Sequence, residues 1–377
     1  MTLTWIFGVL LVLFDTAIGD CECGYSMTVN SDGTRHVFTD LLETDFVHAD
    51  VTGDGRGGAR HGWAPQGYNI TREAARGAFG ESFMIKNVMS DTIKDGSKSE
   101  GTGPAGPDAG LHLVVREAKA DDRVPVAEIS TTGLDYLYGT FRAGIRITDV
   151  AGTCSAFFWY QNDTQEIDIE FLSAEFDRAN DIFPVNLVLQ TRDAAAAGYD
   201  ASNTTGLHRV NLPFDPSAAF HEYRFDFLKD RVLFYADANL LSEMTGDGVP
   251  TSPGHILLSH WSNGNPGWSR GPPASDAVTT VSYVKAYFNS SLEQRQQDFM
   301  TRCKDPAAKG AVCAIPDRNP TFFFSNGDNM TPNQTTYTDP DDGGEDENAV
   351  LGKFDCLTAM VRNCAFWATL SLLYISF

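Results

Sequence analysis

Short apolar segments broken by Gly, Pro, Asn and Asp follow one another along residues 21–291. Strand candidates are 111–115, 139–147, 185–190 and 281–288. Apolar and polar residues alternate strictly over 222–227, and a turn at Lys229-Asp230 leads into the apolar run 232–236, which predicts a β-hairpin. Only 291–301 has a weak helical pattern. Many short strands with turn signals predict an all-β sandwich of two antiparallel sheets.

Composition narrows the classes of protein that fit this pattern. The chain has 377 residues, of which 42% are hydrophobic, which is enough for a core and excludes a wholly disordered chain. Lys and Arg number 28 against 50 Asp and Glu, giving a net charge of −22. Such an acidic chain is not a nucleic-acid binder, because that function needs a basic surface. It suits an extracellular protein or one that handles a neutral ligand.

The N-terminal residues predict secretion. Residues 3–14 are apolar, and Ala17-Ile18-Gly19 places small residues at a signal-peptidase site, so 1–19 is predicted to be a signal peptide cleaved after Gly19. The alternative is a buried N-terminal strand or helix. Six N-x-Ser/Thr sequons support a secretory route and a glycoprotein: Asn69, Asn162, Asn203, Asn289, Asn329 and Asn333.

The composition changes after the strand-rich part, which is assigned as a catalytic β-sandwich over 20–300. Residues 301–348 form a Cys-containing segment and a stalk rich in Asn, Asp, Thr and Pro, which ends in an acidic run. Residues 349–377 are predicted to be a hydrophobic tail, and its last 14 residues are apolar and too short for a comfortable transmembrane helix. This tail suggests a GPI-anchor signal and membrane attachment through a lipid. The alternative is an odd terminal extension.

Seven cysteines fit an oxidising compartment and show no metal-site spacing. Cys303 and Cys313 are expected to close a short loop, whereas Cys21 and Cys23 lack a partner motif. The complete pairing does not follow from the sequence.

Three acidic residues at alternate positions mark the candidate chemistry. Glu166, Asp168 and Glu170 alternate with Ile167, Ile169 and Phe171, so a strand would carry the carboxyls on one face and the apolar side chains on the other. Carboxyls on neighbouring positions of one face lie roughly 6.6 Å apart at Cα, close enough to couple their titrations.

Cleavage of a glycosidic bond uses this kind of pair. It needs one ionised carboxylate as nucleophile and one protonated carboxyl as acid, and a third carboxyl raises the acid's pKa by repulsion. Glu166 and Glu170 are roughly 13 Å apart at Cα in a flat strand, so the sheet has to curve for both to flank one bond. On the motif alone, an acid-rich exposed strand or a metal-binding edge is the alternative.

The surrounding strands carry a resemblance to a known family. QEIDIEFL (165–172), preceded by AFFWY (156–160), resembles the active-site strand of glycoside hydrolase family 16. YGTFRAGIRI (138–147), VNLVLQT (185–191), FHEYRFDFLKDRVLFYAD (220–237) and residues 283–288 look like further strands of that family, in order. The resemblance covers about residues 24 to 290.

The resemblance implies a concanavalin A-like β-jelly roll and a retaining O-glycosyl hydrolase. By position, Glu166 matches the family nucleophile, Asp168 the assisting carboxylate and Glu170 the general acid/base, in an unbulged strand. Phe227 stands where the family usually has Trp. No cofactor is required by this chemistry, and a structural calcium is possible on this fold. A monomer is expected.

Further residues are candidates for sugar binding. Trp159 precedes the catalytic strand, and a core aromatic is the alternative. Trp261 and Trp268 lie in a Gly/Pro-rich loop, where indoles suit the faces of glucosyl rings, and loop packing is the alternative. Gln190 can hydrogen-bond a sugar hydroxyl. His221 is expected to be buried and hydrogen-bonded rather than catalytic.

Together with the predicted stalk and tail, the resemblance implies a secreted, fungal-type enzyme of the cell wall or plasma membrane that cleaves β-glucan of the β-1,3/1,4 type. One rival is a cell-wall glucan transglycosylase that uses the same residues. The other is a non-catalytic carbohydrate-binding wall protein, which would be expected to lack one of the two Glu residues.

Overall fold

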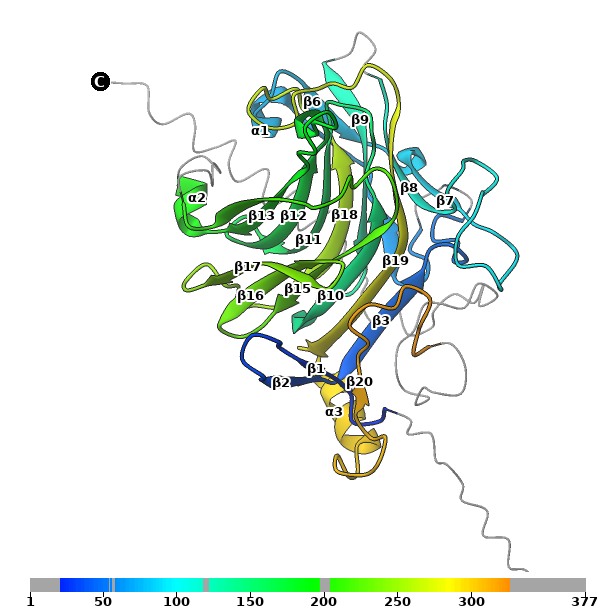
Figure 1. Ribbon diagram of the computed structural model, residues 1–377, viewed down its shortest axis with the longest axis vertical. Helices are drawn as coiled ribbons and strands as arrows, with labels where there is room; N and C mark the ends of the chain where they lie inside the picture. Colours follow the sequence, from blue (N-terminus) through cyan, green and yellow to red (C-terminus); the bar gives the residue numbers. More distant parts are fainter. Residues whose placement is uncertain (1–20, 54, 56–57, 118–121, 197–203, 326–377) are drawn as a thin grey trace, which may run out of the picture.

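The computed structural model describes residues 21–325 apart from 54, 56–57, 118–121 and 197–203. In this part of the chain, two large β-sheets are stacked as curved layers, and the helices are short and peripheral (Figure 1). The predicted signal peptide, most of the stalk, the C-terminal tail and the sequons at Asn203, Asn329 and Asn333 lie outside the described residues.

Two large sheets and one small sheet account for the strands of the described residues. The eight-stranded sheet contains, in spatial order, β17 (Asn239–Thr245), β16 (Arg231–Ala236), β15 (His221–Phe227), β10 (Tyr136–Arg146), β19 (Ala277–Ser290), β8 (Gly110–Val115) and β7 (Val88–Asp91), with β3 (Asp40–Asp45) also paired to β19. The nine-stranded sheet contains β14 (Leu207–Asn211), β13 (Pro184–Gln190), β12 (Gln165–Leu172), β11 (Cys154–Asn162), β18 (His255–Trp261), β9 (Arg123–Thr131), β6 (Gly80–Phe83) and β5 (Tyr68–Ile70), with β4 (Trp63–Pro65) paired to β9. The small sheet contains β2 (Arg35–Phe38), β1 (Tyr25–Thr28) and β20 (Cys313–Ala314).

The predicted all-β sandwich is confirmed, including the hairpin, which is formed by β15 and β16. Pairing in the described strands is antiparallel except between β6 and β9 and between β1 and β20. The helices are α1 (Arg72–Ala75), α2 (Arg192–Ala196) and α3 (Glu293–Arg302), and α3 falls where the weak helical pattern predicted it. In the described part of the chain, no helix has the length and apolar character needed to cross a membrane.

The core lies between the two large sheets. Ile167, Ile169 and Phe171 of β12 are buried in it, and the Phe171 ring lies 4.7 Å from that of Tyr223 on β15. Burying side chains of this size contributes about 1.5–3 kcal/mol each. This apolar side of the alternation fixes the register of β12, because a shift by one residue would bury its carboxyls.

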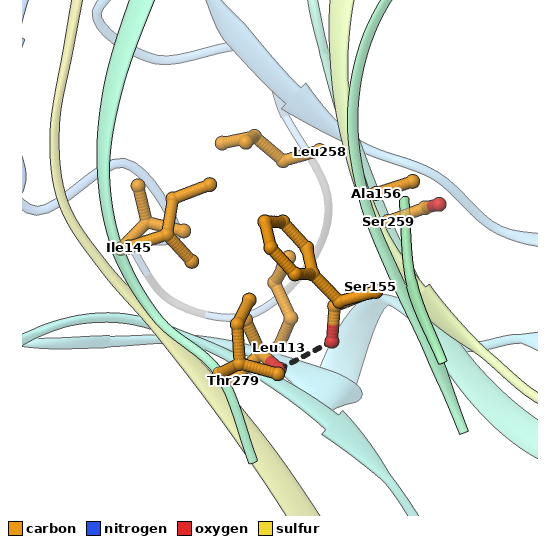
Figure 2. Close-up of a pocket in the computed structure, with 10 residues that line it drawn as sticks. Leu113, Ile145, Ser155, Ala156, Leu258, Ser259 and Thr279 are labelled. Carbon is orange, nitrogen blue, oxygen red and sulfur yellow. Dashed lines mark hydrogen bonds between the residues drawn. The ribbon is translucent and has the colours of Figure 1, made fainter. Parts of the chain in front are cut away.

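A pocket within this core is a packing feature. Figure 2 shows it between the sheets, with Leu113, Ile145 and Leu258 on its walls. A hydrogen bond of 2.6 Å between Ser155 Oγ and Thr279 Oγ1 lies beside it. The pocket has no space for a water molecule, so it is not a candidate binding site.

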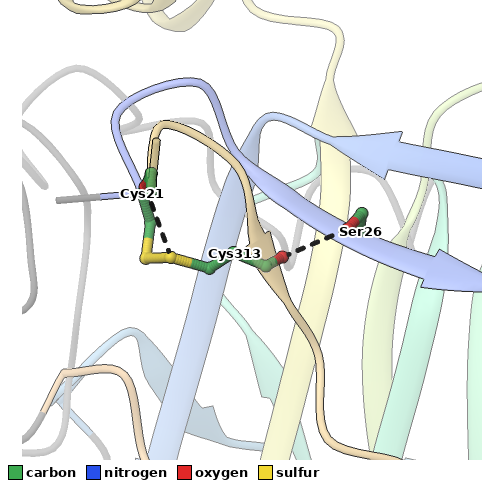
Figure 3. Close-up of a disulfide and its surroundings, with 4 residues drawn as sticks. Cys21, Ser26 and Cys313 are labelled. Atoms are coloured by element: carbon green, nitrogen blue, oxygen red, sulfur yellow. Dashed lines mark hydrogen bonds between the residues drawn. A yellow bond between two sulfur atoms is a disulfide. The ribbon is translucent and has the colours of Figure 1, made fainter. Parts of the chain in front are cut away.

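Two disulfides join the N-terminal segment to a segment that follows α3. Cys21 is bonded to Cys313 (Figure 3), and Cys23 is bonded to Cys303. The expected Cys303–Cys313 pair is therefore wrong. The reason is the parallel pairing of β1 with β20, which brings the two ends of the domain side by side. In the described residues, Cys154 is the free cysteine and is buried.

The segment 313–325 covers the outer face of the eight-stranded sheet. Lys285 Nζ donates to the carbonyl oxygens of Asn319 and Phe322, both at 2.7 Å. The Ser325 amide donates to Glu43 Oε2 at 3.0 Å. Leu233, which faces this layer, is buried against it. The eight-stranded sheet is thus packed on both faces, and the outer face of the nine-stranded sheet carries the acidic side chains of β12.

Candidate active site

The three acidic residues lie on a central strand of the nine-stranded sheet. Strand β12 is paired on one side with β11 and on the other with β13. Because its alternate residues enter the core, Glu166, Asp168 and Glu170 share the outer face. On β11, Glu166 is paired with Tyr160, Asp168 with Phe158 and Glu170 with Ala156. On β13, the same three residues are paired with Gln190, Val188 and Asn186. The geometric prediction from the E-x-D-x-E pattern is confirmed, whereas the chemical roles of these residues remain predictions.

Glu166 and Asp168 are hydrogen-bonded to each other. Burial raises the pKa of Glu166 to about 8, and the charge of Glu170 also raises it, while a hydrogen bond with Asp168 lowers it. Burial, followed by the charges of Glu166 and Glu170, holds the pKa of Asp168 well above its usual range. The hydrogen bond between the two side chains favours a proton on Asp168 and the ionised form of Glu166.

Glu170 has a different set of neighbours. Burial raises its pKa to about 7, and hydrogen bonds from Cys154 and Trp268 and the charge of Arg76 oppose that rise. The Cys154 Sγ lies 3.4 Å from Glu170 Oε1. A carboxyl with this pKa exchanges a proton near neutral pH, as a general acid/base must.

The loop that carries Trp268 is held at both ends. Asn263 Nδ2 donates to the carbonyl of Ala75 at 2.6 Å, and Asn265 Nδ2 donates to that of Arg76 at 3.1 Å. Gly77 permits this approach, since a Cβ there would lie 2.1 Å from the carbonyl oxygen of Asn263. After the loop, Arg270 donates to Glu175 at 3.0 Å. Trp268 is thereby fixed beside Glu170.

A second acidic pair lies on neighbouring strands. Glu128 on β9 accepts a hydrogen bond from the Tyr68 hydroxyl at 3.0 Å, and burial raises its pKa to about 7. Burial and the charge of Glu128 raise the pKa of Glu81 to about 8. The charge of Glu128 also raises the pKa of Glu166, so this pair lies on the same face as the three carboxyls of β12. The sequence pattern does not predict this pair, because the two residues are far apart in the chain.

Three of the four predicted sugar-binding residues lie on the same face as the acidic side chains. Gln190 is paired with Glu166, Trp261 is paired with Cys154 and half-buried, and Trp268 contacts Glu170. Their binding of sugar remains a prediction.

Trp159 lies on the opposite face, which corrects its assignment as a sugar-binding residue. It is fully buried, its indole N–H donates to the carbonyl of Tyr136 at 3.1 Å, and its ring lies 5.0 Å from Phe227. The physical reason is its odd position in β11, which points it into the core with Phe157. Phe227 is likewise a core residue and does not affect the outer face.

His221 is hydrogen-bonded, as expected. Its Nδ1 lies 2.7 Å from Asp237 Oδ2, and its ring stacks on Phe214 with centroids 3.6 Å apart. It belongs to β15 in the other sheet, away from Glu166.

Polar atoms near the acidic residues lack partners among the described residues. They are Asn186 Nδ2 and Gln190 Oε1 on β13, and His255 Nε2 on β18. Asn186 is paired with Glu170 and is 3% exposed. Buried donors and acceptors are normally satisfied, so these atoms are suited to hydrogen bonds with a bound ligand. The sequence contained the signal for Asn186, since positions 186, 188 and 190 share one face of β13.

No group of three or more His, Cys, Asp or Glu side chains in the described residues is arranged to hold a metal ion. The structural calcium stays a prediction.

The family comparison defines the class of protein. Residues 111–285, which run from β8 into β19 and include all of β12, match the family described as Glycosyl hydrolases family 16. This region of the chain thus matches the family, and the resemblance is confirmed.

Particular relatives match about a third of the chain. A β-glucanase from Paenibacillus polymyxa is 28% identical over 147 residues, which is 38% of this chain and 55% of that protein. Congo red hypersensitive protein 1 from Saccharomyces cerevisiae is 27% identical over 133 residues, or 34% of this chain and 24% of that protein. A β-glucanase from Acetivibrio thermocellus is 30% identical over 129 residues, or 33% of this chain and 34% of that protein. The chain thus spans at most about half the length of these relatives.

Solved structures give weaker matches. The endo-β-1,3-glucanase from Pyrococcus furiosus is 17% identical with a TM-score of 0.49, and covers 71% of this chain and 99% of that one. The Bacillus licheniformis β-glucanase is 18% identical with a TM-score of 0.47, and covers 66% and 97%. The fold described above rests on strand pairing and burial in this chain.

Proposed function

We propose that this protein is a retaining glycoside hydrolase that cleaves β-glucan on the outer face of the nine-stranded sheet. Glu166 acts as nucleophile, Glu170 as general acid/base, and Asp168 assists Glu166. The observation that carries the proposal is the placement of three neighbouring carboxyls, of which Asp168 is buried and Glu166 and Glu170 are half-buried, on one face of β12 inside the region that matches family 16. The relatives named as β-glucanases support the substrate class.

The reaction takes place in two displacements. The Glu166 carboxylate attacks the anomeric carbon as the bond to the leaving oxygen breaks, and Glu170 donates its proton to that oxygen. Water then attacks the glycosyl ester on Glu166, Glu170 takes a proton from this water, and Glu166 leaves as a carboxylate. Protonated Asp168 donates a hydrogen bond to Glu166, which stabilises the carboxylate before attack and after release.

Azide rescue assigns the two roles. Glu166→Ala and Glu170→Ala should each lose at least a thousandfold in kcat on a β-glucan with an activated leaving group. With azide, Glu166→Ala should give the α-glycosyl azide, because azide replaces the nucleophile directly. Glu170→Ala should give the β-glycosyl azide, because azide attacks the intermediate on Glu166. The exposed Glu293→Gln on α3 is the control.

Two results would contradict this assignment. Full turnover by Glu166→Ala would exclude the nucleophile. Binding of glucan without any turnover by the wild-type chain on a panel of β-1,3, β-1,4 and mixed-linkage glucans would leave a carbohydrate-binding protein. A labelled acceptor oligosaccharide separates hydrolysis from transfer, since only transfer gives labelled products longer than the acceptor.

We also propose that the enzyme is secreted and held at the cell wall or membrane. The two disulfides in the described residues support an oxidising compartment. Expression of the full chain tests this: the protein should be N-glycosylated and should be released from cells by a phospholipase specific for glycolipid anchors. Recovery of unglycosylated protein in the cytosol would contradict secretion.

A further inference from the structure

Glu170 is contacted by a thiol that the reaction scheme does not use. Cys154 stands at the start of β11, on the same face as Ala156, and is fully buried. Its Sγ lies 3.4 Å from Glu170 Oε1, within the range of a hydrogen bond from sulfur. Cys154 is also the free cysteine of the described residues, since the other four form disulfides.

The thiol is a permanent donor. Burial and the charges of Glu170 and Asp168 hold the pKa of Cys154 well above its usual range. Its proton therefore stays on sulfur throughout the pH range in which Glu170 titrates. A second donor, the Trp268 indole, contacts the same carboxyl from the loop 263–270.

From these contacts we propose that Cys154 is a positioning residue for Glu170: its S–H group donates to one carboxyl oxygen and fixes the orientation of the acid/base. The inference rests on the proposed function of Glu170. With Oε1 held by the thiol, the side chain loses rotational freedom, so that the carboxyl is pre-oriented for proton transfer.

Other charged and titratable groups also act on Glu170 and have to be kept constant. They are Glu166 and Asp168 on its own strand and Arg76 after α1. Its neighbour on β13 is the uncharged Asn186. Cys154 can be changed without altering the charge of any of these groups.

The test compares Cys154→Ala and Cys154→Ser in the full chain. A donor that favours ionised Glu170 lowers its pKa, so loss of the donor raises it. In Cys154→Ala the alkaline limb of the kcat/KM profile should move up by about half a pH unit, with a severalfold lower kcat. In Cys154→Ser, which keeps a donor, the limb should stay near that of wild type.

The neighbouring Ser155→Ala is the matched control. Ser155 faces the core and bonds Thr279, so this variant should lose stability in thermal unfolding without moving the alkaline limb. The proposal would be overturned if the alkaline limb of the kcat/KM profile stayed in place in Cys154→Ala. It would also be overturned if the limb moved as far in Cys154→Ser as in Cys154→Ala.

Infrared spectroscopy tests the contact without turnover. The S–H stretch of Cys154, isolated as wild type minus Cys154→Ser, should shift as Glu170 titrates and should be independent of pH in Glu170→Gln. A pH-dependent shift in an inactive wild-type chain would support the contact while rejecting the proposed function. An S–H band that is independent of pH in wild type would reject the contact.

Discussion

Gln190 is the antiparallel partner of Glu166 across β12 and β13, and its Oε1 has no hydrogen-bond partner in the described residues. A sugar hydroxyl next to the nucleophile would satisfy this acceptor. Gln190→Ala should raise KM about three- to tenfold, as expected for one hydrogen bond, with a smaller change in kcat. Steady-state kinetics on soluble β-glucan measures this, and Gln297→Ala on the exposed face of α3 is the control. An unchanged KM would remove Gln190 from the binding site.

Trp159 and Trp261 lie on opposite faces of the nine-stranded sheet. Substitution of Trp159 should therefore mainly lower stability, and substitution of Trp261 should mainly raise KM. Trp159→Ala opens a cavity and removes the indole hydrogen bond to the Tyr136 carbonyl, so it should cost about 3–5 kcal/mol of stability, with KM unchanged in the folded fraction. Trp261→Ala should raise KM with a smaller loss of stability. Denaturant unfolding and kinetics measure both. A raised KM in stably folded Trp159→Phe would show that Trp159 takes part in substrate binding.

The buried Glu128 should make stability depend on pH. Its pKa in the folded chain, about 7, lies above the ordinary value of 4.5, so its contribution to stability is present below pH 4.5 and is lost as the pH rises through 7. Glu128→Gln keeps an acceptor for Tyr68 and removes this loss. The variant should match wild type at pH 4.5 and should be more stable at pH 8.5 by on the order of 2 kcal/mol.

Thermal unfolding at the two pH values measures this difference, with the exposed Glu100→Gln as control. Equal melting temperatures of wild type and Glu128→Gln at pH 8.5 would contradict a raised pKa.

The Cys23–Cys303 disulfide should contribute to stability and not to catalysis. It closes a loop with a sequence separation of 280, and its removal should cost about 2–5 kcal/mol. The double variant Cys23→Ser/Cys303→Ser avoids a new free thiol and should keep its kcat below its melting temperature, because the bond lies on the side away from Glu166. A loss of kcat in folded protein would show that the small sheet influences the active site.

Much of the fold followed from local patterns. Strict alternation fixed the hairpin of β15 and β16, and in β12 it fixed which side chains enter the core. The same rule, applied to β11, places Trp159 beside Phe157 in the core, which is the alternative that the sequence left open for Trp159. The disulfides were missed because pairing depends on the proximity of distant segments. Glu81, Glu128 and Arg76 were missed for the same reason, since only strand order brings them together.

The layer that covers the eight-stranded sheet has a practical consequence. Both Cys21 and Ser325 lie on that side, so the described domain begins and ends on the face turned away from Glu166 and Glu170. A surface, bead or fusion partner joined at either of these points would hold the molecule with its carboxyls directed outward, toward an insoluble polymer too large to diffuse to it.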